Sequence, residues 1–247
     1  MLRLRTSKFN WRFVLAFIWF YGYSSIKRGY YYVLSYLALP LSLLFFIYIV
    51  SKGHLVQYAI LGGIISIITS NALTAIGDTS FFKLELKLQE LLIAADVSPI
   101  EYLLGIGLGN LLYSLPGLFV YFVLGFLYKI FSLSLLGLTI LTLIIVMVAA
   151  TSLAYMTGSR VSHMRNSWGV GSLLSVILTM LPPLYYPYTF LPKIALYPLI
   201  LSPATPASIF LQDFMTKRII NYYSFLILLA ETIIYLLLAL KLGKWEE

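Results

Sequence analysis

The sequence predicts an all-α membrane protein with six transmembrane helices, forming a single transmembrane domain over residues 1–247. The first observation behind this prediction is composition, since 61% of the residues are hydrophobic and 11% are charged. Soluble domains average roughly 45–50% apolar and about 25% charged residues, so this few ionisable groups would not cover a soluble surface. The second is that long apolar runs recur along the chain at bilayer-spanning length.

Six segments have the length and apolarity to cross a bilayer, which takes about 20 mostly apolar residues. They are Tyr30–Val50, Tyr58–Ile76, Ile100–Leu127, Leu135–Thr157, Trp168–Leu184 and Ile219–Leu240. Before them, residues 1–28 are basic and aromatic, and their apolar run Phe13–Tyr23 is too short to span. We expect an amphipathic helix in the membrane interface here. A cleavable signal peptide is the alternative, although Lys27 and Arg28 follow the run where a small-residue cleavage site would stand.

The distribution of Lys and Arg predicts which side each loop faces. With the N-terminus in the cytosol, six basic residues precede Tyr30 and two lie in each of three later inside segments, which leaves five of the 17 outside. By the positive-inside rule, we expect a multi-pass protein of the cell membrane with both termini cytosolic. The basic N-terminal residues favour contact with membrane lipids over binding of nucleic acid.

The predicted cytosolic segment 78–96 separates the second and third spans. Its apolar and polar residues alternate as in a strand, but Leu, Lys, Glu and Gln favour a helix. Over Phe81–Ile93, helical spacing places Phe81, Leu84, Leu88 and Leu91 on one face and Lys83, Lys87 and Glu90 on the other. We therefore expect a short amphipathic helix. Ser98-Pro99-Ile100-Glu101 then has the residues of a capping box and predicts the start of the third span.

The predicted outside segment 182–217 separates the fifth and sixth spans. It is apolar and rich in tyrosine, yet it contains seven prolines: Pro182, Pro183, Pro187, Pro192, Pro198, Pro203 and Pro206. Proline interrupts the helical hydrogen bonds, so one continuous helix is excluded. Because irregular backbone at membrane depth must be shielded, we expect short re-entrant helices that dip into the outer leaflet.

Residues with possible chemistry are few. No phosphate-binding G-x-x-x-x-G-K-[ST] loop occurs, and cysteine is absent. The two histidines, His54 and His163, fall on opposite sides of the predicted membrane, so the sequence offers no metal site and no catalytic constellation. Glu231 lies in the middle of the last span, where a carboxylate is a functional candidate. The alternative is a structural hydrogen bond to a neighbouring helix.

Polar residues in the second and fifth spans are candidates for lining a substrate path. They are Thr69, Ser70, Asn71, Ser175 and Thr179, and Tyr185 of the proline-rich segment joins them. Hydrogen bonding between helices is the commoner role of such residues in a membrane.

Four stretches resemble the type-2 ABC transporter permeases, the transmembrane subunits of ABC exporters. They are Gly77–Leu92, Val97–Tyr102, Leu181–Pro187 and Leu201–Pro206. The resemblance also covers the six-span order, the interfacial N-terminal helix and the re-entrant segment, and thus nearly the whole chain. Within residues 1–247 we expect no nucleotide-binding domain.

The resemblance implies a coupling helix between the second and third spans that contacts a separate ATPase subunit through Phe81, Phe82, Lys83, Leu84, Glu85, Leu86, Lys87 and Glu90. It implies two copies of that ATPase, which bind ATP and Mg, and a second permease chain, forming a homodimer. The chain itself would hold no cofactor and would not be an enzyme. A hydrophobic or amphipathic substrate, such as a drug, a lipid or a lipid-linked molecule, would move outward between the two permeases by alternating access.

Two other functions stay open at this level. An intramembrane lipid-modifying enzyme would need polar groups clustered at one membrane depth, and only Glu231 and Asn110 come near that. A membrane assembly protein without transport would need neither such a cluster nor an ATPase. Recovery of an ATPase from native membranes would separate the three.

Overall fold

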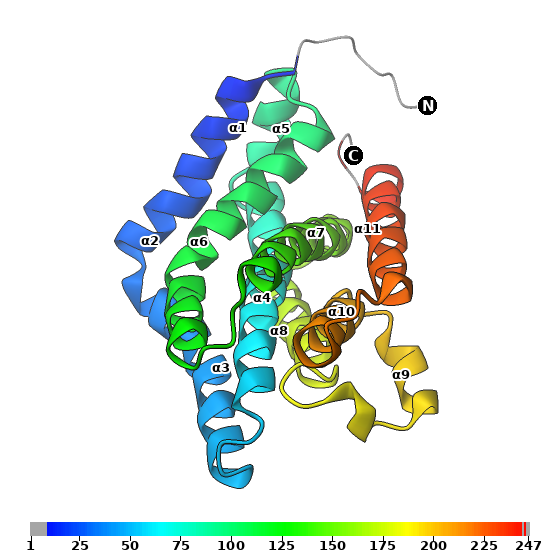
Figure 1. Cartoon of the computed structure of the whole chain (residues 1–247). Coiled ribbons are helices and arrows are strands. Elements are labelled where there is room, and N and C mark those ends of the chain that lie inside the picture. The colour runs from blue at the N-terminus through cyan, green and yellow to red at the C-terminus, as the bar shows by residue number, and fades with distance from the viewer. Residues whose placement is uncertain (1–8, 244, 246–247) are drawn as a thin grey trace.

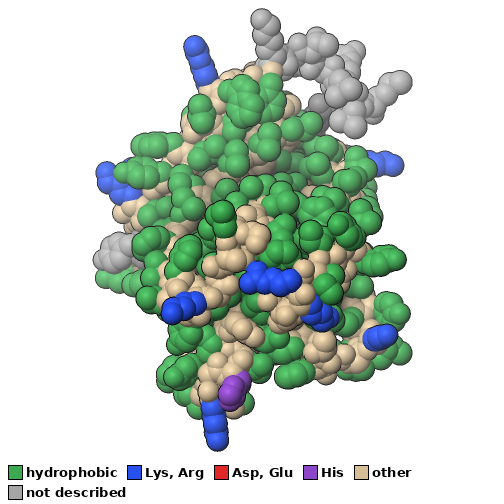
Figure 2. All heavy atoms as spheres, viewed as in Figure 1, with side chains coloured by type: hydrophobic (Ala, Val, Ile, Leu, Met, Phe, Trp, Pro, Cys, Tyr) green, Lys and Arg blue, Asp and Glu red, His purple; other side chains and the backbone are tan. Residues whose placement is uncertain are grey.

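The computed structural model describes residues 9–243 and 245. Within these residues the chain is 81% helical and has no strand, which confirms the all-α class. Five of the described helices are long and apolar enough to cross a membrane: α3 (Tyr30–Val50), α4 (Val56–Leu84), α6 (Pro99–Leu127), α7 (Leu133–Gly158) and α11 (Tyr222–Leu242). Figure 2 shows hydrophobic side chains over most of the visible face, with isolated Lys and Arg between them. By length and composition these are the helices of a membrane protein.

Helix α4 lies at the centre of the fold and is in contact with α3, α6, α7, α8 (Met164–Met180) and α10 (Ala204–Lys217) (Figure 1). Its small residues allow this close approach. A Cβ atom added at Gly62 would lie 2.1 Å from the carbonyl oxygen of Leu184, and one added at Gly63 would lie 2.0 Å from the ring of Tyr121. Larger residues at these two positions would push the neighbouring elements away from α4.

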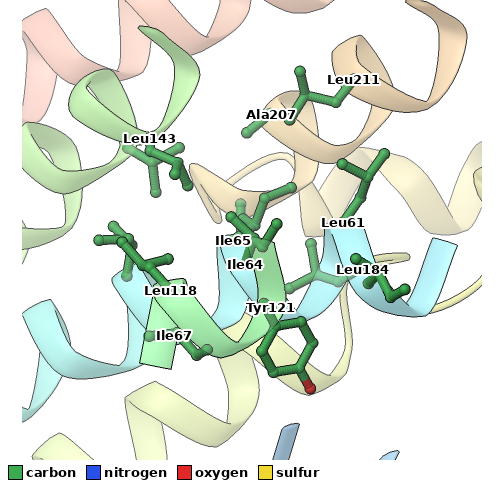
Figure 3. Close-up of a cluster of buried hydrophobic side chains, with 14 of the residues drawn as sticks. Leu61, Ile64, Ile65, Ile67, Leu118, Tyr121, Leu143, Leu184, Ala207 and Leu211 are labelled. Carbon is green, nitrogen blue, oxygen red and sulfur yellow. The ribbon is translucent and has the colours of Figure 1, made fainter. Parts of the chain in front are cut away.

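Two clusters of apolar side chains form the core. The first surrounds the N-terminal half of α4 and includes Ile64 and Ile65 together with Leu118 of α6, Leu143 of α7 and Leu211 of α10 (Figure 3). The second surrounds the other end of α4 and is rich in aromatic residues. It contains Phe17, Phe82, Tyr102, Tyr155 and Trp245.

The N-terminal part of the described chain is one helical run composed of α1 (Trp11–Ile18), the π-helical turn η1 (Trp19–Tyr23) and α2 (Ser24–Arg28). It is longer than the predicted apolar run Phe13–Tyr23, and it packs on α6. Outward-facing side chains at a spacing of four residues, Trp11, Leu15 and Trp19, are each more than 60% exposed. Residues 1–8 of the predicted interfacial segment lie outside the described residues.

The predicted helix over Phe81–Ile93 is not a single helix. Its first turn belongs to α4, which continues to Leu84, and a bend with Lys87 at φ 48° precedes α5 (Leu88–Ala94). The extension of α4 has a tertiary cause. Ser80 Oγ donates a hydrogen bond to the carbonyl oxygen of Gly158 (2.8 Å), and Lys83 Nζ donates one to that of Ser159 (3.2 Å), so the last turns of α4 are fixed to the end of α7.

The predicted capping box is present at the start of α6. The Glu101 backbone N–H donates to Ser98 Oγ (3.3 Å), and the Ser98 backbone N–H donates to Glu101 Oε2 (2.7 Å). Glu101 also accepts a hydrogen bond from the backbone of Asn10, so the cap of α6 is joined to the N-terminal helix.

The predicted fifth span, Trp168–Leu184, corresponds to α8, whose 17 residues begin at Met164 and end at Met180. It ends before Pro182 and Pro183 and is not one of the five long apolar helices. The following proline-rich segment contains η2 (Tyr188–Phe190), α9 (Lys193–Leu199) and α10. Helix α11 begins at Tyr222, later than the predicted Ile219, because the Asn221 side chain caps it by accepting from the Ser224 N–H.

Candidate ligand cavity

A cavity of about 920 Å³ lies along the C-terminal half of α4. It is bounded by η1 and α2 of the N-terminal run and by α3, α4, α6 and α8. Its volume falls within the roughly 300–1,000 Å³ that is typical of ligand sites. Tyr32 on α3 is 73% exposed and Val176 on α8 is 51% exposed, so the cavity opens to the surface between these two walls.

One face of α4 supplies a polar stripe to the cavity. Asn71, Thr74 and Asp78 are three and then four residues apart, which places them on one side of a helix, and Ser70 lies beside them. The hydroxyl of Thr74 donates to the carbonyl oxygen of Asn71 (2.8 Å). The stripe is the part of α4 that presents polar side chains to the cavity.

Hydrogen bonds beside the cavity join α4 to α6. Asn71 Nδ2 donates to Ser114 Oγ (2.9 Å), and the Ser114 hydroxyl donates to the carbonyl oxygen of Asn110 (2.8 Å). Asn110 lines the cavity and is 3% exposed, and its Nδ2 has no hydrogen-bond partner among the described residues. A buried N–H group without a partner is costly, so this amide is a ready donor to an acceptor on a ligand.

Asp78 supplies the negative charge of the cavity. Its Oδ2 accepts a hydrogen bond from the hydroxyl of Tyr21 in η1. The Tyr21 ring is held by Phe82 at a centroid distance of 5.9 Å and lies against Gly109, where an added Cβ would come within 2.8 Å of it. Among the described lining residues Asp78 is the one acid and Arg28 the one base, and no ion pair joins them.

Aromatic side chains make up much of the remaining wall. They are Phe20, Tyr21, Tyr32, Tyr36, Phe81, Phe82, Tyr113 and Trp168. Tyr36 and Tyr113 lie edge to face at 5.2 Å, and the Tyr36 hydroxyl donates to the Tyr113 carbonyl oxygen (3.1 Å). The ring of Trp168 lies over Gly77, which brings α8 close to α4. The walls are therefore held by contacts within the chain.

Four of the six residues predicted for a substrate path line this cavity, namely Ser70, Asn71, Ser175 and Thr179. Thr69 does not line it, because it points into the core and donates to the carbonyl oxygen of Ile65 (2.8 Å). Tyr185 is buried in the first core cluster and also lies away from the cavity.

The residues predicted to contact a partner ATPase fall into two groups. Glu85, Leu86, Lys87 and Glu90 are exposed, on the bend and on α5. Phe81 lines the cavity, Phe82 is 7% exposed within the second core cluster, and Lys83 and Leu84 are partly buried in the last turn of α4. The exposed part of the predicted contact is therefore the bend and the outer face of α5, and not the end of α4.

Glu231 is 9% exposed on α11, and both of its carboxylate oxygens lack a hydrogen-bond partner among the described residues. It does not line the cavity. The structural hydrogen bond considered from the sequence is therefore not made within the described chain.

The sequence predicts cavity residues on α4 and α8. It does not predict that Asp78, Tyr21 and Asn110 line the same cavity. Asp78 falls beyond the predicted end of the second span at Ile76, so the predicted topology places it in the cytosolic segment. Its spacing from Asn71 and Thr74 is the signal that would have placed it on the same helix face. Nothing in the sequence near Tyr21 indicates that its hydroxyl reaches α4.

No family model matches the chain, and neither a curated protein nor a solved structure matches it. No group of three or more His, Cys, Asp or Glu side chains able to hold a metal ion occurs in the part of the chain that the structure describes. The cavity and the exposed residues around α5 therefore carry the functional inference.

Proposed function

We propose that this chain is the membrane-spanning permease of an exporter that is powered by a separate ATPase subunit, as its resemblance to type-2 ABC transporter permeases implies. The observation that carries the proposal is the cavity, because it brings polar residues of the predicted second and fifth spans together in one apolar, aromatic-walled space. Such a space suits a hydrophobic or amphipathic substrate, such as a drug, a lipid or a lipid-linked molecule.

A six-crossing layout is consistent with the lengths of the helices. Helix α8 has 17 residues, which is about 26 Å of helix. A bilayer core is about 30 Å thick, so α8 and the bend that follows it together suffice for a sixth crossing beside the five long apolar helices. The chain then crosses the cell membrane with both termini in the cytosol, as the distribution of Lys and Arg indicates.

The segment that would receive the ATPase is the bend at residues 85–87 together with α5. Leu86 and Leu91 are 48% and 64% exposed there and offer apolar contacts to a partner. Gln89 Nε2 donates to the carbonyl oxygen of Trp245 (2.6 Å), so α5 is joined to the C-terminal end of the chain as well as to α4 and α6. Figure 1 shows α5 and the C-terminal end of α11 at the same end of the molecule. A push on α5 would therefore move several helices together.

The open side of the cavity is consistent with a second permease chain. The mouth lies between α3 and α8 and exposes apolar side chains on both walls, among them Leu39 and Val176. A second copy placed against this side would close the cavity and share it. The ATP and Mg sites would then reside in two ATPase subunits bound at α5 of each chain.

Affinity purification of the tagged chain from its native membrane tests the proposal. We expect an ATPase with phosphate-binding motifs to co-purify and ATP hydrolysis to accompany it. Purification without any ATPase would contradict the proposal and favour an assembly protein. Lipid turnover by the chain alone would favour an intramembrane enzyme.

A matched pair of substitutions locates the contact. Leu91→Glu places a charge on the exposed face of α5 and should abolish recovery of the ATPase while leaving the chain monodisperse. Leu133→Glu is the control, because Leu133 is 89% exposed at the start of α7 and away from α5. Equal recovery of the ATPase with both variants would exclude α5 as its binding site.

A further inference from the structure

The charge at the wall of the cavity is negative, and no cation among the described residues forms an ion pair with it. Among the described residues, the partner of the Asp78 carboxylate is the Tyr21 hydroxyl, which is a neutral donor. A carboxylate at the edge of an apolar space lacks the water that would otherwise solvate it, so a positive charge placed beside it is favoured.

The aromatic walls beside Asp78 also favour a positively charged ligand. Phe81 and Phe82 follow Asp78 on α4, Tyr21 contacts it from η1, and Trp168 faces this part of α4 from α8. The faces of aromatic rings attract cations, and the attraction grows when water is excluded. An anion would be repelled by the carboxylate.

Arg28, the one base of the described lining, does not reverse this conclusion. It is exposed at the end of α2 and forms no ion pair with Asp78. Its charge remains in contact with solvent at the mouth, where water and salt screen it. Of the two described charged residues that line the cavity, Asp78 is therefore the less exposed to solvent.

Asn110 independently indicates that the cavity receives a ligand. Its side-chain amide is 3% exposed and has an N–H group without a partner in the described chain. It lines the same space as Asp78, from α6. A ligand that carries a hydrogen-bond acceptor on its apolar body would satisfy this donor.

We propose that the cavity binds lipophilic organic cations, whose positive charge lies against Asp78 and whose apolar body lies among the aromatic rings. This inference rests on the proposed function in that it names the substrate class of the same cavity. Binding itself needs neither the ATPase nor transport, so it is measured on the purified chain.

The test compares two ions of the same shape and opposite charge, tetraphenylphosphonium and tetraphenylborate, by equilibrium dialysis against the chain in an uncharged detergent. We expect the phosphonium to bind at least about tenfold more tightly than the borate. Asp78→Asn should raise the Kd of the phosphonium about tenfold or more and leave that of the borate unchanged. The asparagine keeps an oxygen that accepts from Tyr21, so it removes the charge and retains the shape.

Asp96→Asn is the matched control, since Asp96 is exposed after α5 and does not line the cavity, and it should leave the binding of both ions unchanged. Equal affinities of the wild-type chain for the two ions, or failure to bind the phosphonium, would overturn the proposal whether or not Asp78→Asn folds. An unchanged Kd in a folded Asp78→Asn variant would overturn it too. ATPase recovery is scored separately, so failure of the export function is distinguished from failure of this inference.

Discussion

The hydroxyl of Tyr21 donates a hydrogen bond to Asp78, which lies 57 residues further along the chain. This contact joins the N-terminal helical run to the central helix α4. Because both residues also line the cavity, it couples the position of a surface helix to the shape of the candidate site. Movement of the N-terminal run away from α4 would open the cavity on that side.

Removing this hydroxyl should destabilise the fold. We expect Tyr21→Phe to cost about 1–3 kcal/mol, because the half-buried carboxylate of Asp78 loses its donor. For a chain of this size that corresponds to a fall in Tm of several degrees, on the order of 2–4 °C per kcal/mol. Thermal unfolding in detergent measures it. Tyr23→Phe is the control, since Tyr23 lies two residues further along and is 45% exposed. Equal Tm values for the two variants would mean that the hydrogen bond adds nothing.

Close packing around α4 predicts opposite effects for two glycine substitutions. A Cβ at Gly62 would meet the Leu184 carbonyl oxygen at 2.1 Å, and backbone cannot yield as a side chain can. Gly62→Ala should therefore cost about 1–3 kcal/mol. At Gly137 of α7 an added Cβ would meet nothing within 4 Å, and Gly137→Ala should be neutral or stabilising by up to about 1 kcal/mol through helix propensity. Thermal unfolding that ranked the two variants in the reverse order would contradict the packing of α4 against the proline-rich segment.

The carboxyl group of Glu231 is buried without a hydrogen-bond partner among the described residues, so it lowers the stability of the chain. Replacing it with an apolar residue of similar size should raise stability by about 1–3 kcal/mol. We expect Glu231→Leu to increase the Tm of the chain purified alone. A decrease would show that Glu231 has a partner outside the described residues, such as a second copy or a lipid.

A transport assay then tests whether Glu231, which lowers stability, has a function. Glu231→Gln keeps the shape of the side chain and removes its ability to ionise. Lost transport with normal expression of this variant would assign Glu231 a functional role, whereas normal transport would make the residue dispensable.

Local signals in the sequence were sufficient where a few adjacent residues determine the structure. The Ser98–Glu101 capping box is an example, since its hydrogen bonds join residues three apart and the third span begins where they predict. The end of α8 differs from the prediction, because the local signal of Pro182 and Pro183 stops the helix at Met180, before the predicted end at Leu184.

Contacts between distant residues were decisive where the prediction failed. The amphipathic pattern over Phe81–Ile93 suits a separate helix, yet hydrogen bonds from Ser80 and Lys83 to the end of α7 extend α4 through its first turn. The cavity depends on the same kind of contact. Asn71 and Ser175 were recognisable as polar residues of two spans, but the role of Asp78 depends on Tyr21, whose hydroxyl reaches it only after the N-terminal run has packed on α6.

Asp213 connects two parts of the proline-rich segment to the start of α11. Its carboxylate accepts hydrogen bonds from the Tyr188 hydroxyl (2.9 Å), from Lys217 Nζ (2.7 Å) and from Asn221 Nδ2 (2.7 Å). These donors lie in η2, in α10 and just before α11. Burial by itself raises the pKa of Asp213. The hydrogen bonds from Lys217, Asn221 and Tyr188 together outweigh this effect, so the pKa falls below the ordinary value of 3.8.

A lowered pKa means that the folded chain binds the proton of Asp213 more weakly than the unfolded chain does. The contribution of Asp213 to stability is therefore fully present above about pH 4 and is lost as the pH falls through the folded-state pKa. At neutral pH, Asp213→Asn should cost about 1–2 kcal/mol, because the ion pair with Lys217 is lost while one acceptor oxygen remains. As the pH is lowered from about 7 to about 3, the Tm values of the wild type and of this variant should converge. Glu90→Gln, at an exposed site on α5, should follow the wild type throughout. Parallel Tm curves for the wild type and Asp213→Asn would show that the carboxylate of Asp213 does not hold η2, α10 and α11 together.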